Sequence, residues 1–478
     1  FVLDFLQLLS FIGLRRNAAA GGGRLDGQCL VFQFRIVYAD GHGMSANHRL
    51  PGMLRHAFCI YEGIWRLVIP WLRHHTRISE GYPQRTLQTV PDPVDLWIQS
   101  ASVGESYLSW ELLSRLNPSR SIRVLTTATT RQGIDVLNQA KAAIRIRNPM
   151  VGMQVRYFPF DRPSLMARTL DQVRPGLMVL LETELWPGLL FALKWRRIPS
   201  MVVNGRMSVK SVTGYRRWPA LWHCLGPDRV LAVSGTDAGR FGSVFPGTEV
   251  SVMHNIKFDR LHLDDPKPAA FFGERFLSNR PFLVLGSVRR EEEDPVHKLI
   301  LRIRCRHPET VIGLFPRHLH RVASWKKRLK AHSVPLRLRS EVKSAMPPGT
   351  VVLWDRIGEL NSAYSRADAA FVGGSLAPVG GQNFLEPLMC GIRPVIGPFW
   401  DNFKWVGADI FDQGLVRVGP DWESAADLLS EDMKATPPRD AIREQAGRYI
   451  RARQGGARSA CRAMEPFLNG IVHPMTQL

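Results

Sequence analysis

Short apolar segments alternate with longer amphipathic segments from about residue 92 to residue 440. The apolar segments are rich in aliphatic side chains and are bounded by turn residues, which is typical of buried strands. They lie at residues 96–99, 123–127, 154–158, 177–181, 201–204 and 229–233, and again at 282–285, 310–315, 351–353, 369–372 and 394–396. Strands that alternate with helices in this way predict an α/β protein with parallel sheets.

A Pro-rich polar segment at residues 264–268 separates the two series of strands. The chain has 478 residues, which is more than one core usually holds. We therefore expect a Rossmann-like domain at 81–262 and a second one at 280–438. Helices at 439–468 are expected to pack back on the first domain.

The N-terminal region differs in pattern from the rest. Residues 1–43 combine an apolar run, an arginine pair and an Ala/Gly-rich patch, so we expect a non-native or disordered extension, with the true start at Met44 or Met53. Residues 57–72 are apolar and aromatic, but fall short of the roughly 20 residues that span a bilayer. Within 53–80 they predict either a helix lying on an anionic membrane surface or a core helix of the first domain.

Charge narrows the choice of partners. The chain carries 63 Lys and Arg against 42 Asp and Glu, a net charge of +21, which favours polyanionic partners. It shows no RNA-binding or zinc-finger pattern, so we expect no nucleic-acid partner. Its six cysteines are scattered without zinc spacing, and no Asp-x-Asp pair occurs, so we expect neither a metal site nor a disulfide framework.

Two glycine pairs follow the apolar segment 369–372. Glycine lets backbone N–H groups approach an anion closely, and a helix N-terminus favours negative charge. A carboxylate on the first turn can accept hydrogen bonds from a ribose, so the segment predicts a nucleotide pocket that is neither GxGxxG nor a Walker A loop. The alternative is a glycine-rich turn that packs a helix on a sheet. The residues concerned are Gly373, Gly374, Gly380, Gly381, Gln382, Asn383 and Glu386.

Two further donors follow strands of the second half. Arg317 comes after segment 310–315 and could clamp a phosphate with two hydrogen bonds. Ser287 follows segment 282–285 in a small-residue turn that could present N–H groups to the same phosphate. The nearby His318 and His320 lack a third ligand, which argues against a metal.

Acidic and basic groups follow strands of the first half. Glu105 closes a Ser-x-x-Glu sequence, so it is either a general base or one half of a helix-capping box. Glu182 and Glu184 follow segment 177–181 and could bind sugar hydroxyls. Arg206 and Lys210 lie in a cationic loop that suits an anionic acceptor or is an ordinary solvated loop.

Taken together, these motifs resemble one family. WIQSASVGE, LETELWPGLL, NGRMS, NIKFD, LFPRHLHR, GGQNFLEP and GPFWDNF occur in the order found in 3-deoxy-D-manno-octulosonic acid (Kdo) transferases, the lipid A glycosyltransferases of Gram-negative bacteria. The resemblance covers residues 53–468. It implies a GT-B fold, with two Rossmann-like domains facing a cleft and an N-terminal interfacial helix. It also implies CMP-Kdo as donor, a tetra-acylated phosphorylated glucosamine disaccharide as acceptor, and no cofactor.

By motif position, the resemblance makes Glu105 the general base. It places the CMP phosphate at Arg317 and at Gly380-Gly381, and the ribose at Glu386, while Arg206 and Lys210 match the acceptor side. Three positions depart from the family pattern: Gln382 and Arg289 replace histidines, and Gly205 replaces an alanine.

Two alternatives stay open at this stage. The chain could be another GT-B nucleotide-sugar transferase, or an inactive relative that binds nucleotide or lipid. For the main interpretation we expect a peripheral or monotopic protein on the cytoplasmic face of the inner membrane, held by the N-terminal helix.

Overall fold

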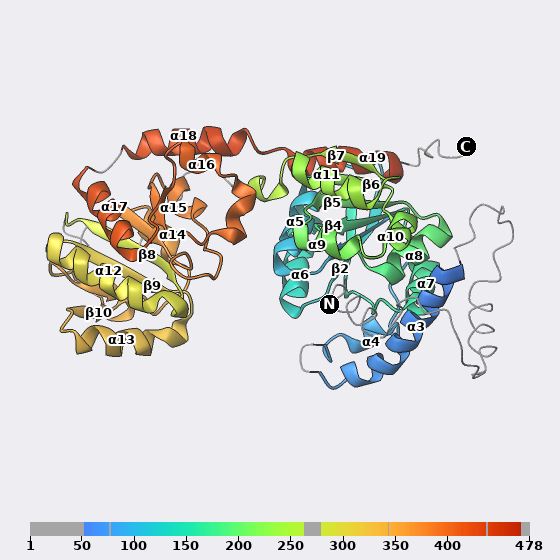
Figure 1. Cartoon of the computed structure of the whole chain (residues 1–478), viewed down its shortest axis with the longest axis horizontal. Helices are drawn as coiled ribbons and strands as arrows, with labels where there is room; N and C mark the ends of the chain where they lie inside the picture. The colour runs from blue at the N-terminus through green and yellow to red at the C-terminus, as the bar shows by residue number, and fades with distance from the viewer. Residues whose placement is uncertain (1–51, 76–77, 262–278, 343, 436–437, 470–478) are drawn as a thin grey trace, which may run out of the picture. The chain divides into compact units, whose positions relative to one another are not determined.

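The computed structural model describes residues 52–75, 78–261, 279–342, 344–435 and 438–469 (Figure 1). The predicted extension at 1–43 lies outside the described residues. The chain divides into two compact units. Unit 1 contains the described residues up to Arg260 and those from Gln454 onward, and unit 2 contains the described residues between Leu261 and Arg453.

Unit 1 is built on a seven-stranded parallel sheet with the order β3-β2-β1-β4-β5-β6-β7. The strands are β1 (Leu96–Ser100), β2 (Ile122–Ala128), β3 (Val151–Tyr157), β4 (Leu177–Leu181), β5 (Ser200–Gly205), β6 (Arg229–Ala232) and β7 (Glu249–Val252). The helices are α3 (Gly52–Leu72), α4 (Tyr82–Arg85), α5 (Val103–Arg115), α6 (Arg131–Arg147), α7 (Pro163–Val173), α8 (Pro187–Arg196), α9 (Val209–Tyr215), α10 (Pro219–Leu225), α11 (Gly235–Val244), η2 (Ile256–Phe258) and α19 (Gly456–Leu468).

Unit 2 repeats this architecture with the strand order β10-β11-β9-β8-β12-β13-β14, again parallel. The strands are β8 (Phe282–Val288), β9 (Val311–Pro316), β10 (Leu336–Leu338), β11 (Val351–Leu353), β12 (Ala369–Val372), β13 (Pro394–Ile396) and β14 (Arg417–Val418). The helices are η3 (Arg290–Glu292), α12 (Glu293–Arg306), η4 (Leu319–Arg321), α13 (Val322–Ala331), η5 (Arg339–Glu341), α14 (Leu360–Tyr364), α15 (Leu385–Met389), η6 (Asp401–Val406), α16 (Asp409–Asp412), α17 (Trp422–Lys434) and α18 (Arg439–Arg451). The predicted α/β class with two Rossmann-like parts is confirmed.

The central strands of unit 1 are buried on both faces because helices cover both sides of the sheet. Trp97 and Met178 point into the core formed with α3, α7 and α8. Leu96 and Leu177, their chain neighbours, point into the core formed with α5, α6 and α19. This alternation with a period of two explains why the sequence shows continuous apolar runs rather than an apolar–polar alternation.

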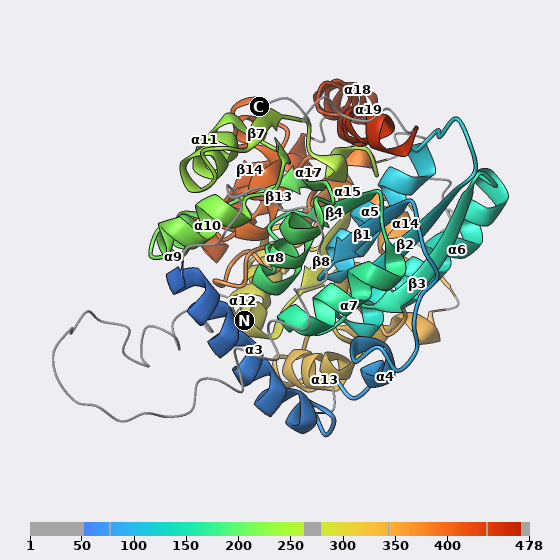
Figure 2. The ribbon, with the colours of Figure 1, turned by 90° about the vertical axis from the view of Figure 1, so that its right-hand side faces the viewer.

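Helix α3 packs one face against unit 1, beside α7 and α8 (Figures 1 and 2). Phe58, Tyr61 and Trp65 are buried there, and the Phe58 ring stacks on Phe191 of α8. The core-helix interpretation therefore holds for this face. The opposite face carries Leu67, which is 74% exposed, and Trp71, which is 80% exposed.

Asp161 ties α3 to α8. The Tyr61 hydroxyl donates to the Asp161 carboxylate at 2.8 Å, and the N–H groups of Gly188 and Leu189 donate to it at 2.8 and 2.7 Å. Burial raises the pKa of Asp161 to about 7, although these three donors lower it. One buried carboxylate thus caps α8 and holds α3 against the sheet.

Three short strands and one helix assignment differ from the expectations. Strands β7, β10 and β14 were not predicted; β7 and β10 are partly exposed edge strands with polar residues, and β14 has two residues. Helix α18 belongs to unit 2, so only the α19 part of the segment 439–468 lies in unit 1.

No helix of the described residues has both the length and the apolar character needed to cross a bilayer.

Candidate functional site

The carboxyl ends of β1 and β4 define the first site. These strands are neighbours in the sheet, but the strands that follow them along the chain extend in opposite directions. Open α/β sheets bind ligands outside the carboxyl ends of the strands at such a topological switch point. Glu105 lies shortly after β1, and Glu182 directly follows β4. The structure therefore brings together two of the acidic residues that the sequence indicated.

Ser102 caps α5 and fixes the Glu105 side chain. The N–H of Glu105 donates to Ser102 Oγ at 3.2 Å, while Ser102 Oγ donates to Glu105 Oε1 at 2.8 Å. The N–H of Ala101 donates to Glu105 Oε2 at 2.6 Å. Half of the predicted capping box is therefore present: Ser102 caps the N–H of Glu105, whereas the Glu105 side chain accepts from the N–H of Ala101 and not from that of Ser102. The side chain is held in one position at the end of β1 and is 7% exposed.

The same carboxyl has the proton affinity of a base that works near neutrality. Burial raises the pKa of Glu105 to about 7, against the Ala101 N–H and the Ser102 hydroxyl, which lower it. The charge of Glu182 raises the pKa further, and Lys257 lowers it. Capping and base chemistry are therefore compatible here, because the cap fixes the carboxyl while the burial sets its pKa.

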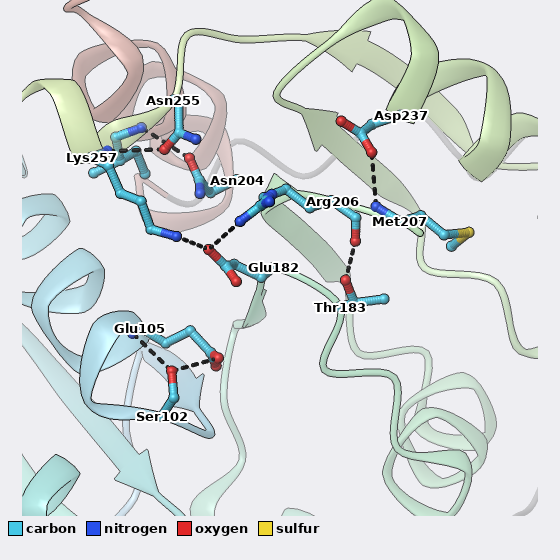
Figure 3. A network of polar contacts seen from close by, with 11 residues as sticks. Ser102, Glu105, Glu182, Thr183, Asn204, Arg206, Met207, Asp237, Asn255 and Lys257 are labelled. Atoms are coloured by element: carbon cyan, nitrogen blue, oxygen red, sulfur yellow. Dashed lines mark hydrogen bonds and ion pairs between the residues drawn. The ribbon is translucent and has the colours of Figure 1, made fainter. Parts of the chain in front are cut away.

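Glu182 lies between two cations (Figure 3). Lys257 Nζ donates to Glu182 Oε1 at 2.7 Å, and Arg206 Nη1 lies 4.0 Å from the same oxygen. The backbone of Glu182 has φ 53°, in the left-handed region, so the chain does not stay extended toward Glu184. All three of these charged side chains are partly exposed, which leaves them accessible to a ligand.

Glu184 is the third acidic group near the switch point. The indole N–H of Trp186 donates to Glu184 Oε2 at 2.9 Å. Burial raises the pKa of Glu184 to about 8, and the negative charges of Glu105 and Glu182 raise it further. The three carboxyl groups are thus electrostatically coupled, and a proton bound at one affects the others.

Lys257 and the amides that support it were not among the predicted site residues. Asn204 Oδ1 accepts from the N–H of Ile256 at 2.9 Å, and Asn255 Oδ1 accepts from the N–H of Lys257 at 3.0 Å (Figure 3). These contacts hold the η2 turn that presents Lys257. The available signal was a lysine in NIKFD, but the preceding strand β7 was missed. Lys210, in contrast, lies on the exposed surface of α9.

The carboxyl ends of β8 and β12 form the corresponding switch point of unit 2. Ser287 has φ 56° and lies where the pairing of β8 with β9 shifts register. The N–H of Arg317 donates to the carbonyl of Val288 at 2.8 Å, and its side chain is exposed. Ser287 and Arg317 are thus neighbours across β8 and β9.

Glu386 lies in the first turn of α15. Asn383 Nδ2 donates to Glu386 Oε1 at 2.9 Å. Burial raises the pKa of Glu386, whereas Asn383 and the positive charge of Arg317 lower it. Arg317, Asn383 and Glu386 therefore belong to one polar group.

The glycine pairs make internal hydrogen bonds. The N–H of Gly381 donates to the carbonyl of Gly374 at 2.7 Å, and the N–H of Gly374 donates to the Glu292 carboxylate. Gly380 accepts from the N–H of Asn402 at 2.9 Å. A Cβ at Gly374 would lie 3.0 Å from Cγ of Gln382 and 3.4 Å from Cγ of Arg289. The N–H groups of Gly374 and Gly381, suggested as phosphate donors, are thus already engaged by the protein.

No set of three or more His, Cys, Asp or Glu side chains suited to a metal ion occurs in the part of the chain that the structure describes. His318 and His320 stack on each other, with ring centroids 5.5 Å apart. The side chains described at the two switch points carry carboxyl, guanidinium and amide groups, with the Lys257 ammonium in unit 1.

Known proteins that are similar to this chain share one description. A family model described as 3-deoxy-D-manno-octulosonic-acid transferase (kdotransferase) matches residues 73–260. The 3-deoxy-D-manno-octulosonic acid transferase of Bordetella pertussis is 29% identical over 387 residues, covering 79% of this chain and 88% of the relative. The enzyme of the same name from Haemophilus influenzae is 27% identical over 387 residues, covering 78% and 86%.

One solved structure shows the same overall fold. A glycosyltransferase from Rickettsia africae has a TM-score of 0.52 at 10% identity, covering 80% of this chain and 100% of that one.

Proposed function

We propose that this chain, whose residues 73–260 match the Kdo transferase family model and which is similar to Kdo transferases over most of its length, transfers Kdo from CMP-Kdo to a lipid A precursor in lipopolysaccharide synthesis. The acceptor in this proposal is a tetra-acylated phosphorylated glucosamine disaccharide. The observation that carries the proposal is the buried Glu105 carboxyl at the switch point of unit 1, with its pKa raised to about 7.

Glu105 is the proposed general base. A hydroxyl oxygen of the acceptor attacks the anomeric carbon of Kdo, and Glu105 takes the hydroxyl proton. The bond between the anomeric carbon and the phosphate oxygen breaks, and CMP leaves with the electron pair. A base with a pKa near the working pH is deprotonated often enough to act and is still basic enough to accept the proton. The buried position of Glu105 supports this role.

Unit 2 supplies the proposed donor-binding groups. Arg317 neutralises the phosphate of the leaving CMP, and Glu386 accepts hydrogen bonds from the ribose, with Asn383 orienting it. Ser287, Gly380, Gly381 and Gln382 complete the proposed donor side. A guanidinium can stabilise a monophosphate leaving group without a divalent ion, so we expect transfer in the presence of EDTA.

Unit 1 supplies the proposed acceptor-binding groups. In this proposal Arg206 and Lys210 attract the acceptor phosphates, and Glu182 and Glu184 accept hydrogen bonds from sugar hydroxyls. The exposed fractions of Arg206 and Glu182, 34% and 22%, support contact with a ligand.

The outer face of α3 is the proposed membrane contact. Ile60, Leu67 and Trp71 follow the helical spacing of one face and are all exposed, and Arg73 comes directly after the helix. An apolar and aromatic stripe next to basic residues suits the surface of an anionic leaflet, which holds the acyl chains of the acceptor. This supports peripheral association with the cytoplasmic face of the inner membrane.

Co-sedimentation with phosphatidylglycerol vesicles tests this contact. We expect Leu67→Ser combined with Trp71→Ser to reduce the bound fraction, because two apolar side chains no longer enter the interface. Ile146→Ser is the matched control, since Ile146 is 84% exposed on α6 and lies outside the stripe. Equal binding of both variants and the parent protein would remove α3 from the proposal.

The transfer itself is tested by the intact mass of the lipid acceptor after incubation with CMP-Kdo and EDTA. We expect stepwise addition of Kdo by the parent protein and by Glu111→Gln, and a rate at least about 10²-fold lower for Glu105→Gln. Glu111 is the control because it lies on the same helix but pairs with Arg115. If the folded parent protein binds CMP and yields no product, Kdo transfer is the wrong assignment, and a different donor sugar becomes the leading alternative.

A further inference from the structure

The glycine pair after β12 surrounds a carboxylate that belongs to the protein. Glu292, at the end of η3, is 0% exposed. Its Oε1 accepts from the N–H groups of Arg289, at 2.9 Å, and of Gly374. Its Oε2 accepts from the N–H groups of Ser375 and Leu376, both at 3.1 Å. Four backbone donors from two separate loops therefore converge on one carboxylate.

The glycines are required by this carboxylate. A Cβ at Gly373 would lie 2.6 Å from Glu292 Oε1 and 2.8 Å from the Cα of Val288, which leaves no room for a side chain. Gly374 has φ 67°, in the region that favours glycine. The Gly-Gly sequence thus has the anion-binding property that its composition indicates, with Glu292 as the bound anion.

The bonds of Glu292 reach the end of a third strand. Ser375 Oγ donates to the carbonyl of Val372 at 2.6 Å and accepts from the N–H of Gly397, after β13, at 2.8 Å. The carbonyl of Gly374 in turn accepts from Gly381 of the second glycine pair. Glu292 consequently holds the segment on which the proposed donor loop, residues 380–386, rests.

We propose that Glu292 is a positioning residue for donor binding. Because its carboxylate already accepts from the N–H groups of residues 374–376, the donor phosphate cannot bind to these groups. The phosphate is then bound on the side of Arg317, with the second glycine pair held in register for the nucleotide. This inference rests on the proposed function for the identity of the donor, and Glu292 itself touches neither donor nor acceptor.

The next residue offers a matched control. Glu293 is 3% exposed, almost as buried as Glu292, but it binds the guanidinium of Arg321 at 2.8 and 2.7 Å. Removing either carboxylate removes a buried anion whose hydrogen bonds are satisfied. Only the loss of Glu292 disturbs the loops at the switch point.

The first experiment measures CMP affinity by titration calorimetry for Glu292→Gln, Glu292→Asp and Glu293→Gln in the full chain. In Glu292→Gln an amide NH₂ replaces one acceptor oxygen and faces backbone N–H groups. We expect its dissociation constant for CMP to rise about tenfold or more, with the donor KM rising more than kcat falls. Glu292→Asp should lie between, and Glu293→Gln should bind CMP as the parent does.

Rescue by a small carboxylate provides a readout that lost stability alone would not produce. We expect formate to restore CMP affinity to Glu292→Ala, because it can bind to the backbone N–H groups that the Glu292 carboxylate occupies in the parent protein. Formate should leave the CMP affinity of Glu293→Ala unchanged. Unaltered CMP affinity in Glu292→Gln, or equal losses in the variants of Glu292 and Glu293 without rescue, would overturn the positioning role. Lack of CMP binding by the parent protein would instead overturn the proposed donor, and this inference with it.

Discussion

Glu105 and Glu292 occupy comparable places in the two units and have different surroundings. Each follows the first strand of its sheet, at the switch point, and each is buried. Glu105 accepts two hydrogen bonds, both from its own turn, and faces the acidic groups that follow β4. Glu292 accepts four, three of them from the loop that follows β12.

The difference indicates that the loop after the neighbouring strand sets the surroundings of such a carboxylate. Burial raises the pKa of both carboxyls. Where the neighbouring loop offers carboxylates, as at Glu105, the buried acid keeps oxygen lone pairs available, as the proposed base requires. Where the neighbouring loop offers N–H groups, as at Glu292, the carboxylate accepts four hydrogen bonds and joins two loops. A glutamate after the first strand of a Rossmann-like unit therefore does not identify a base.

The largest effect is expected from neutralising each glutamate in turn. Glu105→Gln should lower kcat roughly 10²- to 10⁴-fold and leave CMP affinity unchanged, because the base is lost and the donor site is not. Glu292→Gln should instead weaken CMP binding more than it lowers kcat. Single-turnover kinetics together with calorimetry separate the two, and the same pattern in both variants would contradict the comparison.

A methyl group placed against Glu292 should have the next largest effect. We expect Gly373→Ala to lower the stability of unit 2 by about 1–3 kcal/mol, because its Cβ would meet the Glu292 carboxylate and the Val288 backbone. Denaturant unfolding checks this. Gly235→Ala at the start of α11 is the control, as nothing lies within 4 Å of its Cβ. Equal unfolding midpoints would show that the loops around Glu292 adjust to the added methyl group at little cost in stability.

Removing the cap of Glu105 should have a smaller effect. Ser102→Ala should cost about 0.5–2 kcal/mol of stability. Because the Ser102 hydroxyl lowers the pKa of Glu105, the acid limb of the pH–activity profile should also move to higher pH. Ser208→Ala removes the cap of α9 and should cost stability without moving the limb. If the acid limb of the profile does not move in Ser102→Ala, the Ser102 hydroxyl does not control the pKa of the base.

The smallest effects concern the charges around Glu105. Its pKa of about 7 means that the carboxyl is protonated, and inactive as a base, below that pH, so kcat/KM should rise as pH increases through about 7. Glu182→Gln should move this limb to lower pH, because a negative charge that raises the pKa is removed. Lys257→Met should move it to higher pH.

Lys194→Met serves as the control for these two variants, since Lys194 pairs with Asp228 elsewhere in unit 1. Shifts of the same sign in Glu182→Gln and Lys257→Met would show that a different group controls the profile.

Much of the fold could be predicted because buried parallel strands are continuous apolar runs. The central strands β4, β11, β12 and β13 have the predicted bounds. Strands β7 and β14 were missed since their few residues include charged ones, and an edge strand gains less from apolar burial. The apolar run at 57–72 was ambiguous because one face of α3 is buried and the other is exposed, a division that only packing reveals.

The sequence alone determined which chemical groups stand at the ends of the strands: Glu105, Glu182, Arg317 and Glu386 were all found by their position after an apolar run. Only the tertiary structure decided what each group faces. Lys257 meets Glu182 across 75 residues, and Glu292 meets Gly374 across 82. Sequence patterns report burial and local spacing, whereas hydrogen bonds and charge coupling act over a few ångströms in space between strands distant in the chain.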